Sequence, residues 1–321
     1  MKPQDQTNSP DIVVLIPCFD EAAAIGTVIH DFRSALPDAR IVVYDNNSTD
    51  KTAEVAAAAG ATVRSEPLQG KGHVVRRMFA DEEADIYLLV DGDDTYDANS
   101  APAMIDSLIR HRCDMVNGKR ISSSEDAYRF GHRFGNRLLT GMATRIFGHR
   151  IDDMLSGYRV FSRRFVKSFP ALSKGFEIET ELTVHALSLD MPIHELATDY
   201  KERPEGSQSK LNTIRDGMRI LRTIGLLTKQ ERPVLFFGII FALLALASVA
   251  LAIPIFVEYL QTGLVPRFPT AILSASIMLL AFLFLFSGVI LDTVTRGRLE
   301  NKRLHYLSIP WDRSNRQQHS A

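Results

Sequence analysis

The sequence predicts an α/β protein in which a mostly parallel sheet precedes an amphipathic region and two transmembrane helices. Three observations predict it: β-like runs alternate with helical patterns up to about residue 200, a basic amphipathic stretch follows, and two long uncharged apolar runs come last. Strands alternating with helices are typical of a doubly wound parallel sheet covered on both faces. With 321 residues, 45% of them hydrophobic, the chain can build a sizeable core and more than one domain.

The predicted strands and helices of this first part alternate along the chain. The strands are Ile12–Pro17, Arg40–Asp45, Ala61–Ser65, Ile86–Asp91, Met115–Gly118 and, at an edge of the sheet, Ile193–Tyr200. The helices are Ala22–Leu36, Lys51–Ala59, Ala101–Arg112, Tyr128–Phe147 and Glu177–Leu189. Because open α/β sheets bind ligands outside the carboxyl ends of their strands, the residues that follow the first, second and fourth strands should border one crevice.

Two later segments are long and apolar enough to cross a membrane. No charged residue occurs from Val234 to Val257 or from Thr270 to Leu291. Each run can span a hydrocarbon core of roughly 30 Å as a helix, and Pro254 should kink the first helix without abolishing it. Both runs are apolar on all faces, which favours transmembrane helices over the alternative of buried core helices.

Basic residues flank both predicted spans on the same side. Lys229 and Arg232 precede the first span, whereas the only charged residues of the connecting loop Glu258–Pro269 are Glu258 and Arg267. The residues that follow the second span are Arg296, Arg298, Lys302 and Arg303. The positive-inside rule therefore predicts a multi-pass protein of the cytoplasmic (inner) membrane, with the large domain and both termini in the cytoplasm. The polar N-terminus lacks the apolar region of a signal peptide.

The regions predicted along the chain differ in composition. Leu211–Lys229 interleaves apolar residues with arginines, which suits a membrane interface, and an ordinary helix packed on the domain is the alternative. The predicted regions are a disordered N-terminus (1–11), the large domain (12–210), an amphipathic interface region (211–232), a transmembrane hairpin (233–292) and a cytoplasmic tail (293–321). The two cysteines support neither a disulfide framework nor a zinc site, and the net charge of −1 does not favour a nucleic-acid partner.

Carboxylates gather where the predicted strand Ile86–Asp91 ends. Asp91 and Asp93 offer hard oxygen ligands, which suit Mg²⁺ or Mn²⁺, and these ions commonly combine one or two carboxylates with substrate phosphates. A polar loop that caps the next helix is the alternative. The neighbouring strand ends favour the ligand site, because Phe19 offers a ring for a base and Asp45 an acceptor for base or ribose donors. The sequence therefore predicts a nucleotide-binding crevice.

The motif Gly70-Lys71-Gly72-His73 does not make a P-loop. Ser65 stands where that loop needs a glycine, and Gly72 stands where it needs Ser or Thr. The glycine fingerprint of dinucleotide-binding folds is also absent after the first strand. Lys71 can approach a phosphate through its charge, and a solvated turn lysine is the alternative.

Several motifs taken together resemble glycosyltransferase family 2, whose members have the GT-A fold. They are Val13-Val14-Leu15-Ile16-Pro17-Cys18-Phe19-Asp20-Glu21, Asp45-Asn46-Asn47-Ser48-Thr49-Asp50, Gly70-Lys71-Gly72 and Asp91-Gly92-Asp93. Downstream, Ser156-Gly157-Tyr158-Arg159-Val160-Phe161 and Arg203–Lys210 resemble the branch of dolichyl-phosphate mannose synthases and bacterial polyprenyl-phosphate glycosyltransferases, in which paired C-terminal spans also occur. The resemblance covers roughly Ile12–Lys210. Phe19-Asp20-Glu21 departs from the commoner Tyr-Asn-Glu at its first two positions and keeps the aromatic ring and the acidic Glu21.

The resemblance implies an inverting glycosyltransferase that moves a sugar from a UDP- or GDP-linked donor to polyprenyl phosphate, either undecaprenyl or dolichyl. A metal on Asp91 and Asp93, with Thr95 as an additional contact, would neutralise the leaving diphosphate. The implied donor contacts are Pro17, Phe19, Glu21, Asp45 and Lys71. Arg203 and Lys210 would fold over the diphosphate. Arg120 and Arg133 would hold the acceptor phosphate, and Asp153 would orient the acceptor or act as a base. The alternative is that these residues only carry charge at the surface; this applies to Arg120, Arg133, Asp153, Arg203 and Lys210.

Two other functions stay open. A processive polysaccharide synthase would carry a Gln-x-x-Arg-Trp motif and more spans, but the only tryptophan, Trp311, lies outside any such motif. A noncatalytic membrane scaffold that keeps the nucleotide-sugar fold would need no metal cluster and diphosphate clamp together. The oligomeric state is also open, since spans this simple can pack between the protomers of a homo-oligomer.

Overall fold

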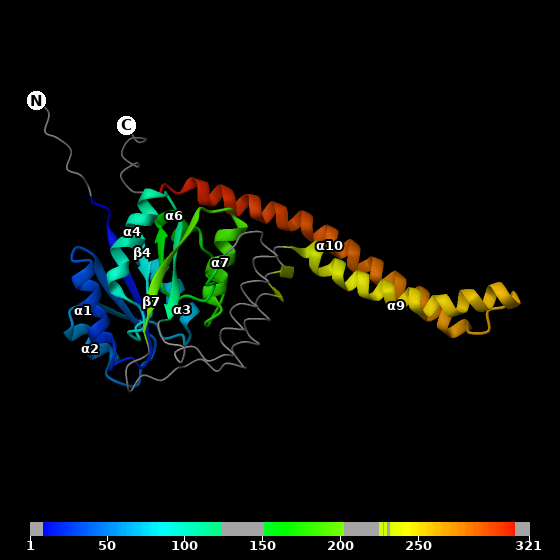
Figure 1. Cartoon of the computed structure of the whole chain (residues 1–321), viewed down its shortest axis with the longest axis horizontal. Helices are drawn as coiled ribbons and strands as arrows, with labels where there is room; N and C mark the ends of the chain where they lie inside the picture. Colours follow the sequence, from blue (N-terminus) through cyan, green and yellow to red (C-terminus); the bar gives the residue numbers. More distant parts are fainter. Residues whose placement is uncertain (1–8, 123–150, 202–224, 227, 230–231, 312–321) are drawn as a thin grey trace, which may run out of the picture. The chain divides into compact units, whose positions relative to one another are not determined.

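The computed structural model describes residues 9–122, 151–201, 225–226, 228–229 and 232–311 (Figure 1). The chain splits into two compact units. The first, which we call the sheet unit, comprises Met1–Leu221 and Lys302–Ala321, and the second, the hairpin unit, comprises Arg222–Asn301. The predicted helix Tyr128–Phe147 and nearly all of the amphipathic stretch Leu211–Lys229 lie outside the described residues.

A seven-stranded sheet forms the centre of the sheet unit, with the strand order β3-β2-β1-β4-β6-β5-β7. The strands are β1 (Ile12–Cys18), β2 (Arg40–Asp45), β3 (Thr62–Ser65), β4 (Ile86–Leu89), β5 (Met115–Ser122), β6 (Arg159–Ser162) and β7 (Ile193–Tyr200). All neighbours run parallel except β6, which is antiparallel to both β4 and β5. The predicted mostly parallel sheet is confirmed, and β7 lies at its edge as predicted.

Helices cover both faces of the sheet (Figure 1). The helices α1 (Ile25–Ala35), α2 (Thr52–Ala58) and α4 (Ala101–Arg110) pack together on one face. The other face carries α3 (Lys71–Asp81), α6 (Arg163–Ser168) and α7 (Ile178–Ser188). A short 3₁₀ helix, η1 (Ala98–Ser100), precedes α4. The main core cluster combines the apolar strand residues with the inward faces of α1 and α4, as the burial of Val14, Phe32 and Leu108 illustrates.

Besides the short η1, three elements were not predicted from the sequence, and each has a local reason. The strand β6 is only four residues long and begins with an arginine, so it lacks the apolar run that indicates a buried strand. The helix α3 begins at Lys71 between two glycines, which are poor helix formers. The helix α6 is a single short segment that follows β6 directly.

The hairpin unit contains the two long apolar helices. These are α9 (Pro233–Thr262) and α10 (Phe268–Ser308), whose 18-residue apolar windows have mean hydropathies of 2.8 and 2.4. Only 6% and 17% of these windows are buried, so the alternative of core helices is wrong for these segments, and by length and composition both can cross a membrane. The helix α9 continues through Pro254.

The helix α10 extends well beyond the predicted span. Its last turns, from Lys302 on, belong to the sheet unit, so the predicted tail 293–321 begins as part of this helix. There the Tyr306 hydroxyl donates to the fully buried Asp114 carboxylate at 2.5 Å, and the indole N–H of Trp311 donates to the carbonyl of Cys113 at 3.2 Å. These contacts attach the end of α10 at the beginning of β5.

Candidate active site

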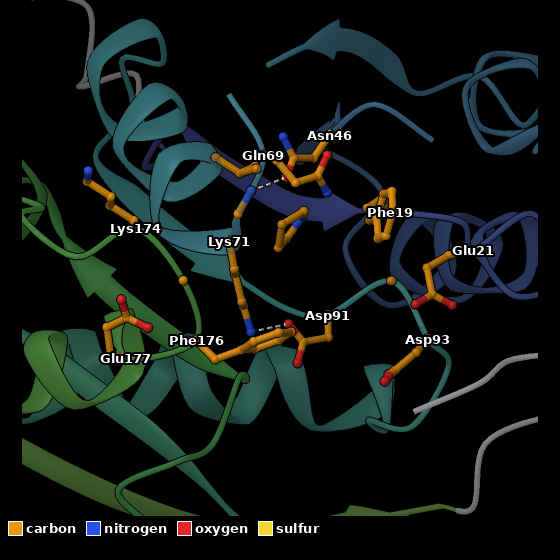
Figure 2. A pocket seen from close by; sticks show the side chains of 16 residues that line it. Phe19, Glu21, Asn46, Gln69, Lys71, Asp91, Asp93, Lys174, Phe176 and Glu177 are labelled. Atoms are coloured by element: carbon orange, nitrogen blue, oxygen red, sulfur yellow. Dashed lines mark hydrogen bonds and ion pairs between the residues drawn. The ribbon is translucent and has the colours of Figure 1, made fainter. Parts of the chain in front are cut away.

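A cavity of about 560 Å³ opens at the carboxyl ends of β1, β2 and β4 (Figure 2). Its walls are contributed by Pro17, Cys18, Phe19 and Glu21 after β1, Asn46 after β2, Gln69, Gly70, Lys71 and Val74 around the start of α3, Asp91, Gly92 and Asp93 after β4, and Lys174, Gly175, Phe176 and Glu177 before α7. The three strand ends therefore border one crevice, as the sequence predicts. The wall from Lys174 to Glu177 was not anticipated.

The end of β1 supplies an aromatic ring and an acid. Phe19 and Glu21 both line the cavity, and the main chain between them turns through Asp20, whose φ of 52° is left-handed. This turn is fixed by its neighbours: Glu21 N–H donates to Thr52 Oγ1 at 2.8 Å, and Asp20 N–H donates to Ser48 Oγ at 2.9 Å. The site therefore has a preformed wall on the β1 side.

The end of β2 places two neighbouring residues differently. Asp45 does not line the cavity; its Oδ2 accepts from Ser48 N–H at 3.3 Å, and its buried Oδ1 has no hydrogen-bond partner among the described residues. Asn46, which sequence reasoning missed, lines the cavity instead. Its amide nitrogen donates to the carbonyls of Glu66 and Leu68, both at 2.8 Å, and its oxygen accepts from Gly70 N–H at 2.7 Å. Asn46 thus connects β2 to the start of α3.

Lys71 is a buried residue of the site. Its side chain is 8% exposed, and Nζ lies 2.5 Å from Asp91 Oδ1 and 2.6 Å from Glu179 Oε1. Burial alone would lower the pKa of Lys71, but the two facing carboxylates outweigh it and raise that pKa. Burial raises the pKa of Glu179, and Lys71 opposes this shift. The alternative of a solvated turn lysine is therefore wrong.

Asp91 and Asp93 both line the cavity (Figure 2). Asp93 is 4% exposed, and its Oδ1 accepts from the Thr95 hydroxyl at 2.6 Å. Thr95 is buried behind Asp93 and does not line the cavity, so it orients that carboxylate. Among the described residues no group of three or more His, Cys, Asp or Glu is placed to hold a metal. Two cavity-lining carboxylates nevertheless fit Mg²⁺ or Mn²⁺ that a bound diphosphate completes.

Arg120 and Asp153 contact each other. The guanidinium donates from Nε and Nη2 to the two carboxylate oxygens of Asp153, at 2.7 and 2.8 Å, and lies over the Tyr200 ring with its centre 5.5 Å from the centroid. Neither residue lines the cavity. Arg133, Arg203 and Lys210 lie outside the described residues.

Glu177 and Glu179 were predicted only as the beginning of a helix. Acidic residues are common in the first turn of helices, so their positions carry no signal of a site. Glu179 meets Lys71 across 108 residues of sequence, and only the packing of α7 against α3 brings them together. Gly70 and Gly72 let the segment before α7 lie close to the start of α3, because a Cβ at Gly70 would lie 2.2 Å from Lys174 O and one at Gly72 would lie 2.2 Å from Ser173 O.

Comparison with known proteins identifies the class of protein that this fold and cavity define. The family model "Glycosyl transferase family 2" matches residues 13–169. Glycosyltransferase AglJ of Haloferax volcanii is 32% identical over 302 residues, which are 93% of this chain and 99% of that protein. The chain therefore belongs to glycosyltransferase family 2 and is a glycosyltransferase.

One further relative and one solved structure are also similar to this chain. A dolichyl-phosphate hexose transferase of Haloferax volcanii is 27% identical over 222 residues, covering 69% of this chain and 96% of that protein. A crystal structure of glucosyl-3-phosphoglycerate synthase from Mycobacterium tuberculosis, in complex with Mn²⁺, UDP and phosphoglyceric acid, matches with a TM-score of 0.54 at 23% identity over 68% of this chain and 78% of that one. The sheet unit thus has the GT-A-like fold of such glycosyltransferases.

Proposed function

We propose that this protein is a membrane-anchored, metal-dependent inverting glycosyltransferase that transfers a sugar from a nucleotide diphosphate sugar to polyprenyl phosphate at the cytoplasmic face. The observation that carries the proposal is the cavity itself, which Asp91, Asp93 and Lys71 line at the carboxyl edge of the sheet and in which Lys71 pairs with Asp91. The relative named as a dolichyl-phosphate hexose transferase supports a lipid phosphate acceptor, and α9 and α10 support a membrane location.

The donor would bind along the strand ends. Phe19 offers a ring for the base, and Asn46 lines the cavity at the end of β2 in place of the expected Asp45. Asp91 and Asp93 would hold Mg²⁺ or Mn²⁺, which would neutralise charge on the leaving diphosphate. Lys71 adds a fixed ammonium on the same side of the cavity. We propose that Arg203 and Lys210 complete the diphosphate site, and Pro17 and Glu21 its wall.

Transfer would proceed by direct displacement. An oxygen of the acceptor phosphate forms the new bond to the anomeric carbon while the bond from that carbon to the diphosphate oxygen breaks, which inverts the configuration. The nucleoside diphosphate leaves with the electron pair of that bond. Because a phosphate is already anionic at neutral pH, positioning and charge neutralisation dominate over base catalysis. We propose that Arg120 and Arg133 attract the acceptor phosphate and that Asp153 orients it through Arg120.

The orientation in the membrane follows from the charged flanks. Glu258–Pro269 would lie on the far side of the membrane and both termini in the cytoplasm. Cysteines introduced at Thr262 and at Gln318 into a variant without the native cysteines test this arrangement. An impermeant label added to intact cells should react at position 262 and not at position 318, and the reverse pattern would overturn the proposed orientation.

A donor panel tests the function. Full-length protein in nanodiscs is given labelled UDP- and GDP-sugars with undecaprenyl or dolichyl phosphate, and lipid-linked sugar is measured with Mn²⁺, with Mg²⁺ and with excess chelator. We expect chelation and Asp93→Asn to nearly abolish transfer. Asp106→Asn, which changes an exposed carboxylate on α4, is the matched control and should transfer normally.

Three outcomes would contradict parts of the proposal. Transfer at the wild-type rate in excess chelator would exclude the metal. Binding of a nucleotide sugar without transfer to any lipid phosphate would instead favour the noncatalytic scaffold. A polymeric product from one donor would favour a polysaccharide synthase.

A further inference from the structure

Arg159 is a fully buried arginine in the middle of the sheet. It opens β6, where it lies opposite Leu89 of β4 and Asn117 of β5, and it is 0% exposed. A charged side chain is rarely buried this completely unless its donors are satisfied. Burial lowers the pKa of Arg159, and the nearby carboxylates of Glu179 and Asp153 oppose this. Burying this charge costs free energy unless hydrogen bonds to the guanidinium compensate for the lost water.

The guanidinium holds the segment 153–157, which we call the junction loop. Nη2 donates to the carbonyl of Met154 at 2.7 Å, and Nε donates to the carbonyl of Ser156 at 3.0 Å. A third bond, from Nη1 to Thr183 Oγ1 at 2.9 Å, connects the group to α7. The planar guanidinium thus fixes the carbonyls of Met154 and Ser156 relative to α7, the helix that carries Glu179.

One end of the junction loop supports Asp91. A Cβ at Gly157 would lie 2.3 Å from Asp91 Oδ2, so the bare main chain of this glycine forms the surface against which the carboxylate rests. The N–H of Gly157 donates to the Tyr96 hydroxyl at 2.8 Å, which fixes the glycine from the other side. Any shift of the loop would therefore change where Asp91 points in the cavity.

The other end of the junction loop supports Arg120. Asp153 lies in the loop and accepts two bonds from the Arg120 guanidinium, at 2.7 and 2.8 Å. The carbonyl of Asp153 accepts from Asn117 Nδ2 at 2.7 Å, so its main chain is held against β5. The position of Arg120 therefore depends on the same five residues as the position of Asp91.

We propose that Arg159 is a positioning residue that, through the junction loop, sets Asp91 and Arg120 together. This rests on the proposed function, in which these two side chains serve the donor diphosphate and the acceptor phosphate. Donor and acceptor groups must be aligned for direct displacement, and one rigid element between them keeps that alignment. A lysine at position 159 keeps the charge but cannot form the same fork to two carbonyls.

The test compares Arg159→Lys with Arg163→Lys in full-length protein in nanodiscs. Arg163 is a matched control, because it is 7% exposed, begins α6 and lies beside Asp85 at the opposite end of β4. Mn²⁺ binding in the presence of UDP or GDP is measured by electron paramagnetic resonance, and sugar transfer is measured separately per folded protein. Supporting residues of this kind typically change metal affinity or activity by about tenfold to 100-fold, and we expect Arg159→Lys to weaken both within that range. Arg163→Lys should change neither.

Tyr96→Phe keeps the test decisive where Arg159→Lys does not fold. It removes only the hydroxyl that accepts from Gly157 N–H, and it should weaken Mn²⁺–nucleotide binding in the same direction by a smaller factor. Wild-type Mn²⁺–nucleotide affinity and wild-type turnover in the folded variants would overturn the inference. If the wild type transfers no sugar to any lipid phosphate, the proposed function fails. Weakened Mn²⁺–nucleotide binding in Arg159→Lys alone would still support the link from Arg159 to Asp91.

Discussion

Replacing Lys71 by methionine removes a buried ammonium and leaves the carbon chain. Nζ lies 2.5 Å from Asp91 Oδ1 and 2.6 Å from Glu179 Oε1, and the three side chains are 8%, 27% and 11% exposed. Without Nζ, the two carboxylate oxygens would face each other no more than about 5 Å apart, which costs about 3 kcal/mol at an effective dielectric constant of about 20. Breaking a buried ion pair by removing one partner costs a similar amount.

We therefore expect Lys71→Met to lower the free energy of unfolding by about 3 kcal/mol near neutral pH, which corresponds to a melting temperature lower by roughly 6–12 °C for a unit of this size. The loss should shrink in acid. Burial already raises the pKa of Glu179, and a carboxyl whose folded pKa is raised costs stability above its unfolded pKa and recovers it as the pH falls back through the folded value.

Thermal unfolding followed by the fluorescence of Trp311, the only tryptophan, measures this in detergent or nanodiscs. Lys174→Met is the matched control, because Lys174 also lines the cavity but is exposed, and its melting temperature should not change. The double variant Lys71→Met/Glu179→Gln should recover most of the lost stability, since it removes the second carboxylate. A single variant as stable as the wild type, or a double variant no more stable than the single one, would refute the electrostatic reasoning.

Three further predictions concern stability and the cavity wall. His185 is buried, and burial, followed by the charge of Lys302, lowers its pKa to about 3. Below about pH 6.5 the unfolded chain binds a proton at this histidine that the folded chain does not, so the free energy of unfolding should fall by about 1.4 kcal/mol per pH unit as the pH falls. His185→Gln should make the free energy of unfolding, measured in urea, less dependent on pH in this acid range. Tyr306→Phe should cost about 1–3 kcal/mol by removing a hydrogen bond to buried Asp114, whereas Tyr259→Phe, at an exposed tyrosine of α9, should cost nothing measurable in the same melts. Gly72→Ala should lower the free energy of unfolding by about 1–3 kcal/mol and weaken nucleotide binding measured by calorimetry, because its Cβ would lie 2.2 Å from Ser173 O. Gly26→Ala is the control and should be tolerated, because the nearest atom to its Cβ lies at 3.4 Å. Equal nucleotide affinity in the two variants would contradict the packing argument.

The sequence by itself determined the strands that carry the site and the two apolar helices. β1, β2 and β4 were predictable because buried parallel strands read as apolar runs, and such a run is visible in the local sequence. Asp91 and Asp93 were predictable as cavity residues for the same reason, since they follow such a strand directly. The long uncharged runs of α9 and α10 needed no knowledge of their surroundings.

Tertiary structure alone decided which side chains face one another. Successive residues of an extended chain point to opposite sides, so a shift of one residue placed Asn46 rather than Asp45 in the cavity wall. Lys71 and Glu179 are 108 residues apart, and Asp114 and Tyr306 are 192 apart. No periodicity links residues at such separations, because the packing of whole helices against the sheet brings them together. The antiparallel β6 and its buried Arg159 were also decided by the tertiary structure alone. A short strand with a charged residue becomes favourable only once its neighbours supply carbonyls for the guanidinium.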